Sequence, residues 1–205
     1  MISCNIVGGL GNQLFQIFTT IAHSVRQNSE YVFPTNKTYI YDKRETYWDN
    51  IFNQLKTSEK LPDLKNYNEQ SFRYHPIYQI SNIKLCGWFQ SYKYFENEYL
   101  YIFKLCKLDE KRLLCLDKYK YSYDNCISIH FRMGDYSKPQ HLSYHGICTN
   151  DYYIKGIETI VNNTNTKFDI LCFSEKDDEK CINDRIEYIR KSFQLLILLK
   201  YLMIY

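Results

Sequence analysis

Residues 126–193 alternate between short apolar runs and longer segments with helical spacing, and this alternation limits the fold more than any other feature of the chain. Residues 126–132 and 168–173 have the apolar, β-branched character of buried strands. Residues 154–161 and 177–193 place isoleucines at helical spacing. Strand, helix, strand and helix in this order predict an α/β fold with a parallel sheet.

The first residues of the chain show a similar pattern. Residues 2–7 are predicted to form a strand, followed by a glycine turn and a helix whose apolar spacing starts at Leu14. Residues 82–89 indicate another buried strand, and residues 92–105 a helix with an aromatic face. The polar region 30–80 predicts no clear element. Because the segment 118–125 is polar and separates the two halves, we predict domains at 1–122 and 123–205.

Composition narrows the classes of function. The 205 residues include 26 Lys and Arg against 23 Asp and Glu, and a net charge of +3 predicts neither nucleic acid nor an acidic membrane as the partner. The eight cysteines contain no CxxC pair, which favours reduced thiols in a cytoplasmic protein over disulfides or zinc. The chain does not open on a signal-peptide pattern, and the apolar segment 195–205 is too short for a transmembrane helix. We therefore predict a cytoplasmic protein that is soluble or weakly associated with membranes.

A first candidate site is the glycine turn between the first strand and its helix. The turn is followed by Asn12 and Gln13, whose amides suit sugar hydroxyls or a phosphate oxygen at a helix N-terminus. It has neither the Walker nor the GxGxxG pattern. A tight turn without a ligand is the alternative interpretation.

A second candidate site follows the strand 126–132. Strand alternation predicts His130 and Arg132 on one face, at the carboxyl end where parallel sheets bind ligands. Arg132 could bind a phosphate through two parallel hydrogen bonds, and Asp135 could orient His130 or accept a proton. An ion pair between Arg132 and Asp135 that holds a turn is the alternative.

Metal ligands are not indicated by the sequence. Residues 175–178 (EKDD) could hold a metal or a ribose, but a solvated helix start is the favoured interpretation, because acidic residues favour that position. No Asp-x-Asp triplet is present that would hold a metal-bound diphosphate.

Five segments in order carry a family resemblance: GGLGNQLFQ (8–16), GWFQSYKYF (87–95), HFRMGDY (130–136), the NDYY helix start (150–153) and FSEKDD (173–178). Together they resemble glycosyltransferase family 11, the α-1,2-fucosyltransferases that use GDP-fucose. The resemblance implies a GT-B-like pair of Rossmann-type domains, the first on the acceptor side and the second binding the GDP-sugar, with the active site in the cleft between them. It also implies inverting transfer of fucose to a galactose hydroxyl of a glycan without a metal or other cofactor. The residues it assigns are His130, Arg132 and Asp135 at the donor site and Gly9, Gly11, Asn12 and Gln13 near the sugar and phosphates.

The chain departs from the family pattern in two ways. Met133 stands where many members carry a second arginine, and a serine- and tryptophan-rich motif expected after FSEKDD is absent. We therefore expect the second domain to be incomplete, with residues 195–205 covering its open sheet edge or making a self-association contact. Two alternatives follow, an inactive remnant that only binds a GDP-sugar and a GT-B transferase for another nucleotide sugar.

Overall fold

The computed structural model describes residues 1–35, 45–119, 124–164, 166, 168–175 and 178–193. The chain divides into two compact units, Met1–Lys120 and Tyr121–Tyr205, and each is described on its own. Both units combine helices with parallel strands, which confirms the α/β prediction. The apolar segment 195–205 lies outside the described residues.

Unit 1 is built around a three-stranded parallel sheet with the order β1-β5-β4. The strands are β1 (Ile2–Cys4), β5 (Ile83–Cys86) and β4 (Lys65–Asn68), and Ile83 is in register with both Ile2 and Lys65. The strands expected near residues 2 and 82 are confirmed with shorter ends. A separate parallel pair, β2 (Phe33–Pro34) and β3 (Thr57–Ser58), and β4 itself lie in the region for which the sequence predicted no element.

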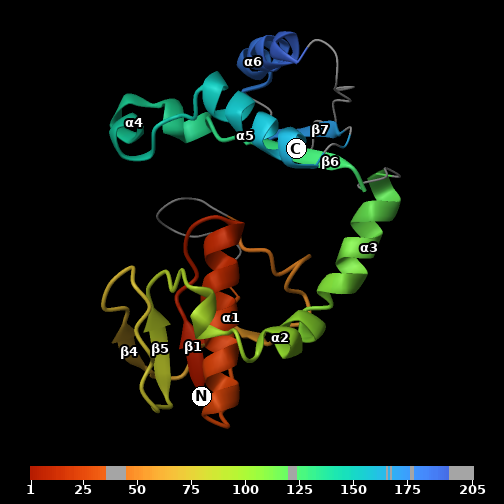
Figure 1. Cartoon of the computed structure of the whole chain (residues 1–205). Helices are drawn as coiled ribbons and strands as arrows, with labels where there is room; N and C mark the ends of the chain where they lie inside the picture. Colours follow the sequence, from red (N-terminus) through yellow and green to blue (C-terminus); the bar gives the residue numbers. More distant parts are fainter. Residues whose placement is uncertain (36–44, 120–123, 165, 167, 176–177, 194–205) are drawn as a thin grey trace. The chain divides into compact units, whose positions relative to one another are not determined.

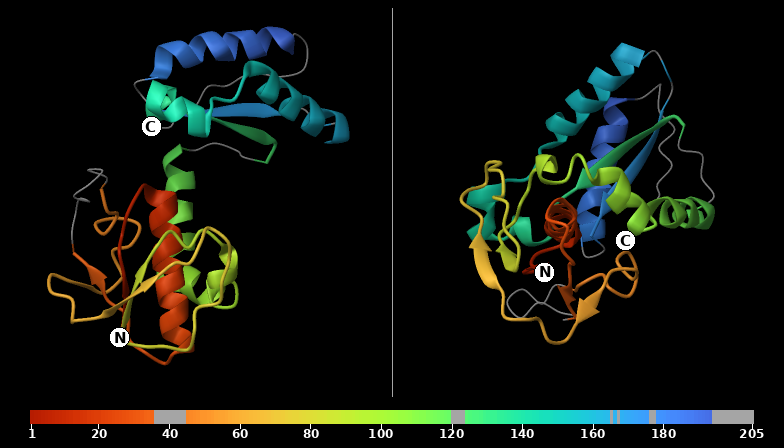
Figure 2. Two further views of the ribbon diagram at one scale, coloured as in Figure 1. Left: turned by 90° about the vertical axis from the view of Figure 1, so that its left-hand side faces the viewer. Right: turned by 90° about the horizontal axis from the view of Figure 1, so that it is seen from below.

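Helix α1 (Leu10–Arg26) lies along β1, as Figures 1 and 2 show. Its buried face includes Ile17 and Ile21, which pack against the apolar residues of β1 and β5. The helix begins one turn earlier than the apolar spacing predicted. The reason is that Gly9, in an extended conformation, serves as the N-cap, so Leu10 to Gln13 already form the first turn.

The single helix predicted for residues 92–105 is divided into η1 (Tyr92–Tyr94) and α2 (Tyr99–Leu105). Two successive side chains explain the break, because Tyr94 packs on Phe89 and Phe95 packs on Phe18. Neighbouring residues of a continuous helix point about 100° apart, so the backbone leaves the helix for both rings to be buried. Helix α3 (Leu108–Tyr119) follows.

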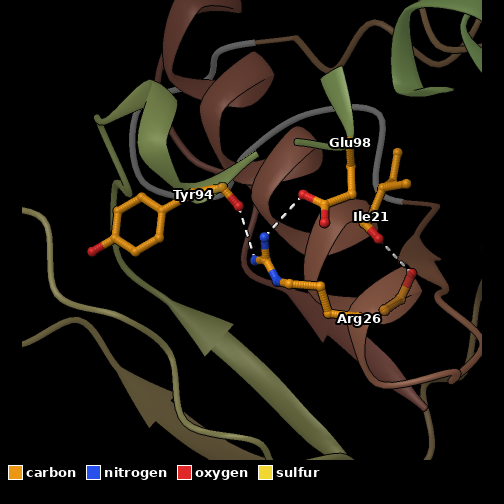
Figure 3. Close-up of polar contacts among 5 residues, drawn as sticks. Ile21, Arg26, Tyr94 and Glu98 are labelled. Carbon is orange, nitrogen blue, oxygen red and sulfur yellow. Dashed lines mark hydrogen bonds and ion pairs between the residues drawn. The ribbon is translucent and has the colours of Figure 1, made fainter. Parts of the chain in front are cut away.

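Arg26, the last residue of α1, anchors the segment between η1 and α2. Its guanidinium donates one hydrogen bond of 2.9 Å to Glu98 Oε2 and another of 2.9 Å to the backbone oxygen of Tyr94 (Figure 3). Arginine suits this position because it offers several N–H donors in a fixed plane. The end of α1 and the end of η1 are therefore held together by one side chain.

Unit 2 contains the parallel pair β6 (Cys126–Phe131) and β7 (Asp169–Ser174), side by side in Figure 1. Their helices are α5 (Asn150–Thr164) and α6 (Glu179–Ser192), and two short elements follow β6, η2 (Gly134–Ser137) and α4 (Pro139–His145). Ile157 of α5 and Ile182, Ile186 and Ile189 of α6 form one core with the strands, as the spacing predicted. Ile160, expected on the same face, is 40% exposed and lies at the edge of the apolar stripe.

All eight cysteines are free thiols, and only Cys4, Cys106 and Cys172 are fully buried. Within the described part of the chain, no helix combines the length and the apolar character needed to cross a bilayer.

Candidate functional site

The HFRMGDY motif leaves β6 at its carboxyl end, beside the end of β7. Phe131 is in register with Ser174, so the residues that follow each strand, Arg132 and Glu175, become neighbours. The half-buried Arg132 guanidinium donates through Nη1 to Glu175 Oε1 in an ion pair. The parallel register thus joins the HFRMGDY and FSEKDD motifs into one cluster.

Gly134 continues this cluster through its backbone. Its N–H donates a 2.6 Å hydrogen bond to Asp178 Oδ2. Its φ of +39° lies in the left-handed region, and an added Cβ would stand 2.5 Å from Glu175 Oε2. Glycine is favoured here by its conformation, and a side chain at this position would also displace the end of the Glu175 side chain. Glu175 and Asp178, interpreted from the sequence as a solvated helix start, instead bind residues of the β6 motif.

Arg132 also lies on an aromatic stack. Its Cζ is 4.3 Å from the centroid of the Tyr136 ring, and that ring stacks on His145 at 4.0 Å with an interplanar angle of 9°. A guanidinium over an aromatic face is attracted by the ring quadrupole and is held in a fixed plane. The site therefore presents an oriented cation whose plane is fixed before any ligand arrives.

The other two predicted residues of this site are His130 and Asp135, and the structure describes fewer of their contacts. His130 is exposed, while Phe131 and Met133 contact the core, so the alternation runs as predicted. The backbone oxygen of His130 accepts a 3.0 Å hydrogen bond from the Tyr153 hydroxyl. Asp135 lies in η2, and its side chain falls outside the described ones, as do its predicted contacts with His130 and Arg132.

Arg185 of α6 is a residue of this site that the sequence did not reveal. Its Nε donates to Asn150 Oδ1 at 2.8 Å, and its Nη2 donates to the backbone oxygen of Cys148. The guanidinium lies 5.4 Å from the ring centroids of both Phe131 and Tyr153. Arg185 thereby joins α6 to the end of β6 and to the start of α5. The available signal was its place beside Ile182 and Ile186, where a charged residue flanks the apolar stripe of the helix.

The glycine turn of unit 1 forms the second candidate site. Gly8 has a φ of +76°, and an added Cβ would stand 2.3 Å from Asn12 Nδ2. Gly9 caps α1, and an added Cβ at Gly11 would meet nothing within 4 Å. Gly9, Gly11 and Asn12 therefore lie together at the exposed N-terminal end of a long helix, where backbone N–H groups and the helix dipole favour anions.

Gln13 supports this turn from inside. Its side chain is 1% exposed, and its Nε2 donates to the backbone oxygens of Gly8 at 2.9 Å and Glu45 at 2.8 Å. The buried Gln16, which the sequence did not single out, accepts from the N–H of Val7 at 3.0 Å and donates to the oxygen of Gly87 at 3.3 Å. Two buried amides thus fix the course of the chain on both sides of the turn.

The turn also contacts the GWFQSYKYF motif. Gln90 Nε2 donates a 2.7 Å hydrogen bond to Asn12 Oδ1 across a separation of 78 residues. This contact arises because β1 and β5 are parallel neighbours, so the residues after both strands emerge at one sheet edge. Among the described residues, no group of three or more His, Cys, Asp or Glu side chains is arranged to hold a metal ion.

Comparison with proteins of known function relates the chain distantly to α-1,2-glycosyltransferases. It is similar to the α-1,2-colitosyltransferase of Escherichia coli, with 25% identity over an alignment of 234 positions, gaps included, that covers 92% of this chain and 79% of that protein. This similarity supports, at the level of the family, the resemblance to glycosyltransferase family 11 that the five segments carry. No family model matches the chain, and no solved structure matches it.

Proposed function

We propose that the chain is an inverting α-1,2-fucosyltransferase that transfers fucose from GDP-fucose to a galactose hydroxyl of a glycan. The observation that carries the proposal is the Arg132 cluster, in which a guanidinium is held between Glu175 and the Tyr136 ring at the carboxyl end of β6. The distant α-1,2-colitosyltransferase relative supports the class of reaction. The proposal includes a GT-B-like architecture, with an acceptor-side first domain and a GDP-sugar-binding second domain.

Arg132 is proposed to bind the diphosphate and to stabilise the negative charge that grows on GDP as the glycosidic bond breaks. A guanidinium suits this role because it binds phosphate through two parallel N–H donors and stays charged at every relevant pH. In the ligand-free protein Glu175 is its counter-ion. When the donor binds, its diphosphate replaces the Glu175 carboxylate as the counter-ion of Arg132. The diphosphate carries more negative charge than the carboxylate.

His130 and Asp135 are proposed to belong to the same donor site, with Asp135 orienting His130 or accepting a proton. Gly9, Gly11 and Asn12 are proposed to contact the sugar and phosphates through the N-terminal end of α1. Gln13 is buried in the ligand-free protein, so it contributes by holding the backbone of Gly8 in place.

The identity of the donor sugar is the finer part of the proposal. The relative is a colitosyltransferase, so the colitosyl counterpart of the fucosyl donor is the second candidate. Titration of GDP-fucose, GDP-colitose, GDP-mannose and UDP-galactose separates the donors. GDP-sugar binding without any transfer assigns the chain to the alternative of a non-catalytic sugar-nucleotide binder.

Substitution of Arg132 tests the proposal. Arg132→Ala is expected to lower the turnover for fucose transfer by about 10²- to 10³-fold, the usual effect of removing a preorganised charge-stabilising donor. Arg132→Lys keeps the charge but not the planar fork, so an intermediate loss is expected. The control is Arg112→Ala, which removes an exposed arginine from α3. Equal transfer by unmodified protein and Arg132→Ala would contradict the assignment.

A further inference from the structure

Part of the GWFQSYKYF motif lies outside the residues proposed to bind the donor. It begins at Gly87, directly after β5, at the carboxyl edge of the sheet. The neighbouring strand β4 ends at Asn68, so Glu69 emerges at the same edge. Ligands of open α/β sheets bind outside the carboxyl ends of parallel strands. This edge of unit 1 is therefore a candidate ligand-binding edge.

The turn after β5 is fixed by the Glu69 carboxylate. Glu69 Oε2 accepts from the N–H of Trp88 at 2.7 Å, and Oε1 accepts from the N–H of Phe89 at 3.0 Å. An added Cβ at Gly87 would stand 2.4 Å from Glu69 Cβ, and the buried Phe89 has a φ of +50°. A bulky residue in the left-handed region is strained, and such strain is concentrated at functional sites.

A pocket of about 190 Å³ lies against this turn, lined by Glu69, Ser71, Phe72, Cys86, Gly87 and Trp88. This volume is smaller than the roughly 300–1,000 Å³ clefts that take drug-sized ligands, so a single ring is the fitting size. Phe72 is 76% exposed and Trp88 is half-buried, so two aromatic side chains are available to a ligand.

The charge of the pocket lining disfavours an anionic ligand. Glu69 is the charged group among the six lining residues, and burial raises the pKa of the Cys86 thiol, which stays neutral. A phosphate in this pocket would be repelled by the Glu69 carboxylate, and none of the six lining residues carries a positive charge to offset this repulsion. A neutral polyhydroxy ring fits better, because each carboxylate oxygen accepts about two hydrogen bonds and the backbone uses one at each.

The segment that carries Phe72 is itself held in place. Ser71 Oγ is 3.0 Å from His75 Nε2, and the N–H of His75 donates to the Tyr94 hydroxyl at 3.2 Å. The Tyr74 ring packs on the Tyr94 ring with centroids 4.8 Å apart. An exposed aromatic side chain on an anchored backbone is a preorganised surface, which lowers the entropy lost on binding.

We propose that this pocket is a carbohydrate subsite that takes a galactose ring, the ring face against Phe72 and Trp88 and the hydroxyls donating to Glu69. The inference rests on the proposed function for two points, namely that the ring is galactose and that it belongs to the acceptor glycan.

Lactose, a neutral disaccharide that ends in galactose, is the probe. Its binding to the full chain is followed by saturation-transfer NMR, and GDP binding is measured in parallel by calorimetry. Phe72→Ala and Trp88→Ala are expected to weaken lactose binding by about 3- to 10-fold and to leave GDP binding unchanged. Because Phe72 is so exposed, its substitution leaves the fold intact. Tyr101→Ala, which removes an exposed aromatic ring from α2, is the matched control and is expected to bind lactose normally.

Three results overturn the proposal: no lactose binding by the unmodified chain, equal binding by both pocket variants, or a loss of GDP binding in place of lactose binding. The proposed function fails separately. Phe72-dependent lactose binding without transfer from any donor keeps the pocket and removes the transferase. Transfer with an unchanged KM for lactose in Phe72→Ala keeps the transferase and removes the pocket.

Discussion

Arg26→Ala is expected to destabilise unit 1 well beyond what the loss of a surface charge would cause. Arg26 holds the Glu98 carboxylate and the Tyr94 carbonyl with two hydrogen bonds of 2.9 Å (Figure 3). The Glu98 side chain is only 12% exposed, so truncation of Arg26 leaves a largely buried carboxylate without this partner. Leaving a charged group unpaired in this way costs more than the pair itself contributes.

The magnitude follows from these two contacts. Hydrogen bonds to charged groups contribute about 1.5–3 kcal/mol, and the 35% exposure of the Arg26 side chain reduces that value through solvent screening. We expect the free energy of unfolding to fall by about 2 kcal/mol. For a unit of this size, the melting temperature then falls by roughly 6–10 °C.

Tryptophan fluorescence during thermal unfolding measures this change selectively, because Trp48 and Trp88, the two tryptophans of the chain, both lie in unit 1. Arg112→Ala is the matched control. Its guanidinium is 3.8 Å from Asp109 Oδ1, and both side chains are about two-thirds exposed (65% and 67%). Such an exposed pair contributes about 0.5 kcal/mol or less. A double-mutant cycle with Glu98→Gln isolates the ion pair, with an expected coupling of about 1 kcal/mol.

Equal melting temperatures for Arg26→Ala and Arg112→Ala would refute the reasoning. So would a coupling energy near zero together with a large effect of Arg26→Ala, because that combination assigns the stabilisation to the Tyr94 carbonyl alone.

Three further predictions concern metal, pH and thiol chemistry. Fucose transfer is expected to survive EDTA, because Arg132 supplies a fixed positive charge at the leaving diphosphate; loss of transfer that manganese restores would instead indicate the acidic residues after β7 as ligands. Burial lowers the pKa of His23, whose ring nitrogen is 2.8 Å from the Ile80 oxygen, so the unfolded chain takes up the proton first as the pH falls. Unit 1 should therefore lose stability as the pH falls below about 6.5, and the tryptophan-monitored melting temperature of His23→Gln should depend less on pH across this range. Burial raises the pKa of Cys4 to about 12 and those of Cys106 and Cys172 to about 11, so iodoacetamide should label the exposed Cys115, Cys148 and Cys181 first, as peptide mass spectrometry can establish. Early labelling of Cys4 in the folded protein would show that unit 1 opens more readily than this burial implies.

The elements that bury an apolar face were predictable from the sequence. Ile182, Ile186 and Ile189 identify α6 because helical spacing brings them onto one face, and β6 is identified by its alternating burial. Strand β4 could not be found in this way. Its residues, KNYN, lie at an exposed sheet edge, where backbone pairing with β5 holds the strand without the apolar pattern of a buried strand.

The candidate site was predictable as residue types but not as pairs. The sequence identified Arg132 as a site residue but favoured a solvated helix start for the acidic residues after β7. Their contact with Arg132 depends on the register that sets Phe131 beside Ser174. The buried position of Gln13 depends likewise on the backbone at Glu45, which is distant in sequence. Contacts of this kind arise from tertiary packing, which the local spacing of residues in the sequence does not predict.

The strand order of unit 1 has a consequence for synthesis of the protein. β1 pairs with β5, and Ile2 is in register with Ile83, so the three-stranded sheet cannot form until residue 83 has been synthesised. The backbone of Ile2 also hydrogen-bonds Glu30 and Val32, which are synthesised earlier. At about 5–20 residues per second, ribosomes need roughly 4–16 s to cover that separation. During this interval the apolar face of α1, including Ile17 and Ile21, is exposed on the nascent chain. In unit 2, β6 and β7 are separated by about half as many residues. Recovery of folded protein is therefore expected to depend on chaperones that bind the first eighty residues, and on translation that does not pause before residue 83.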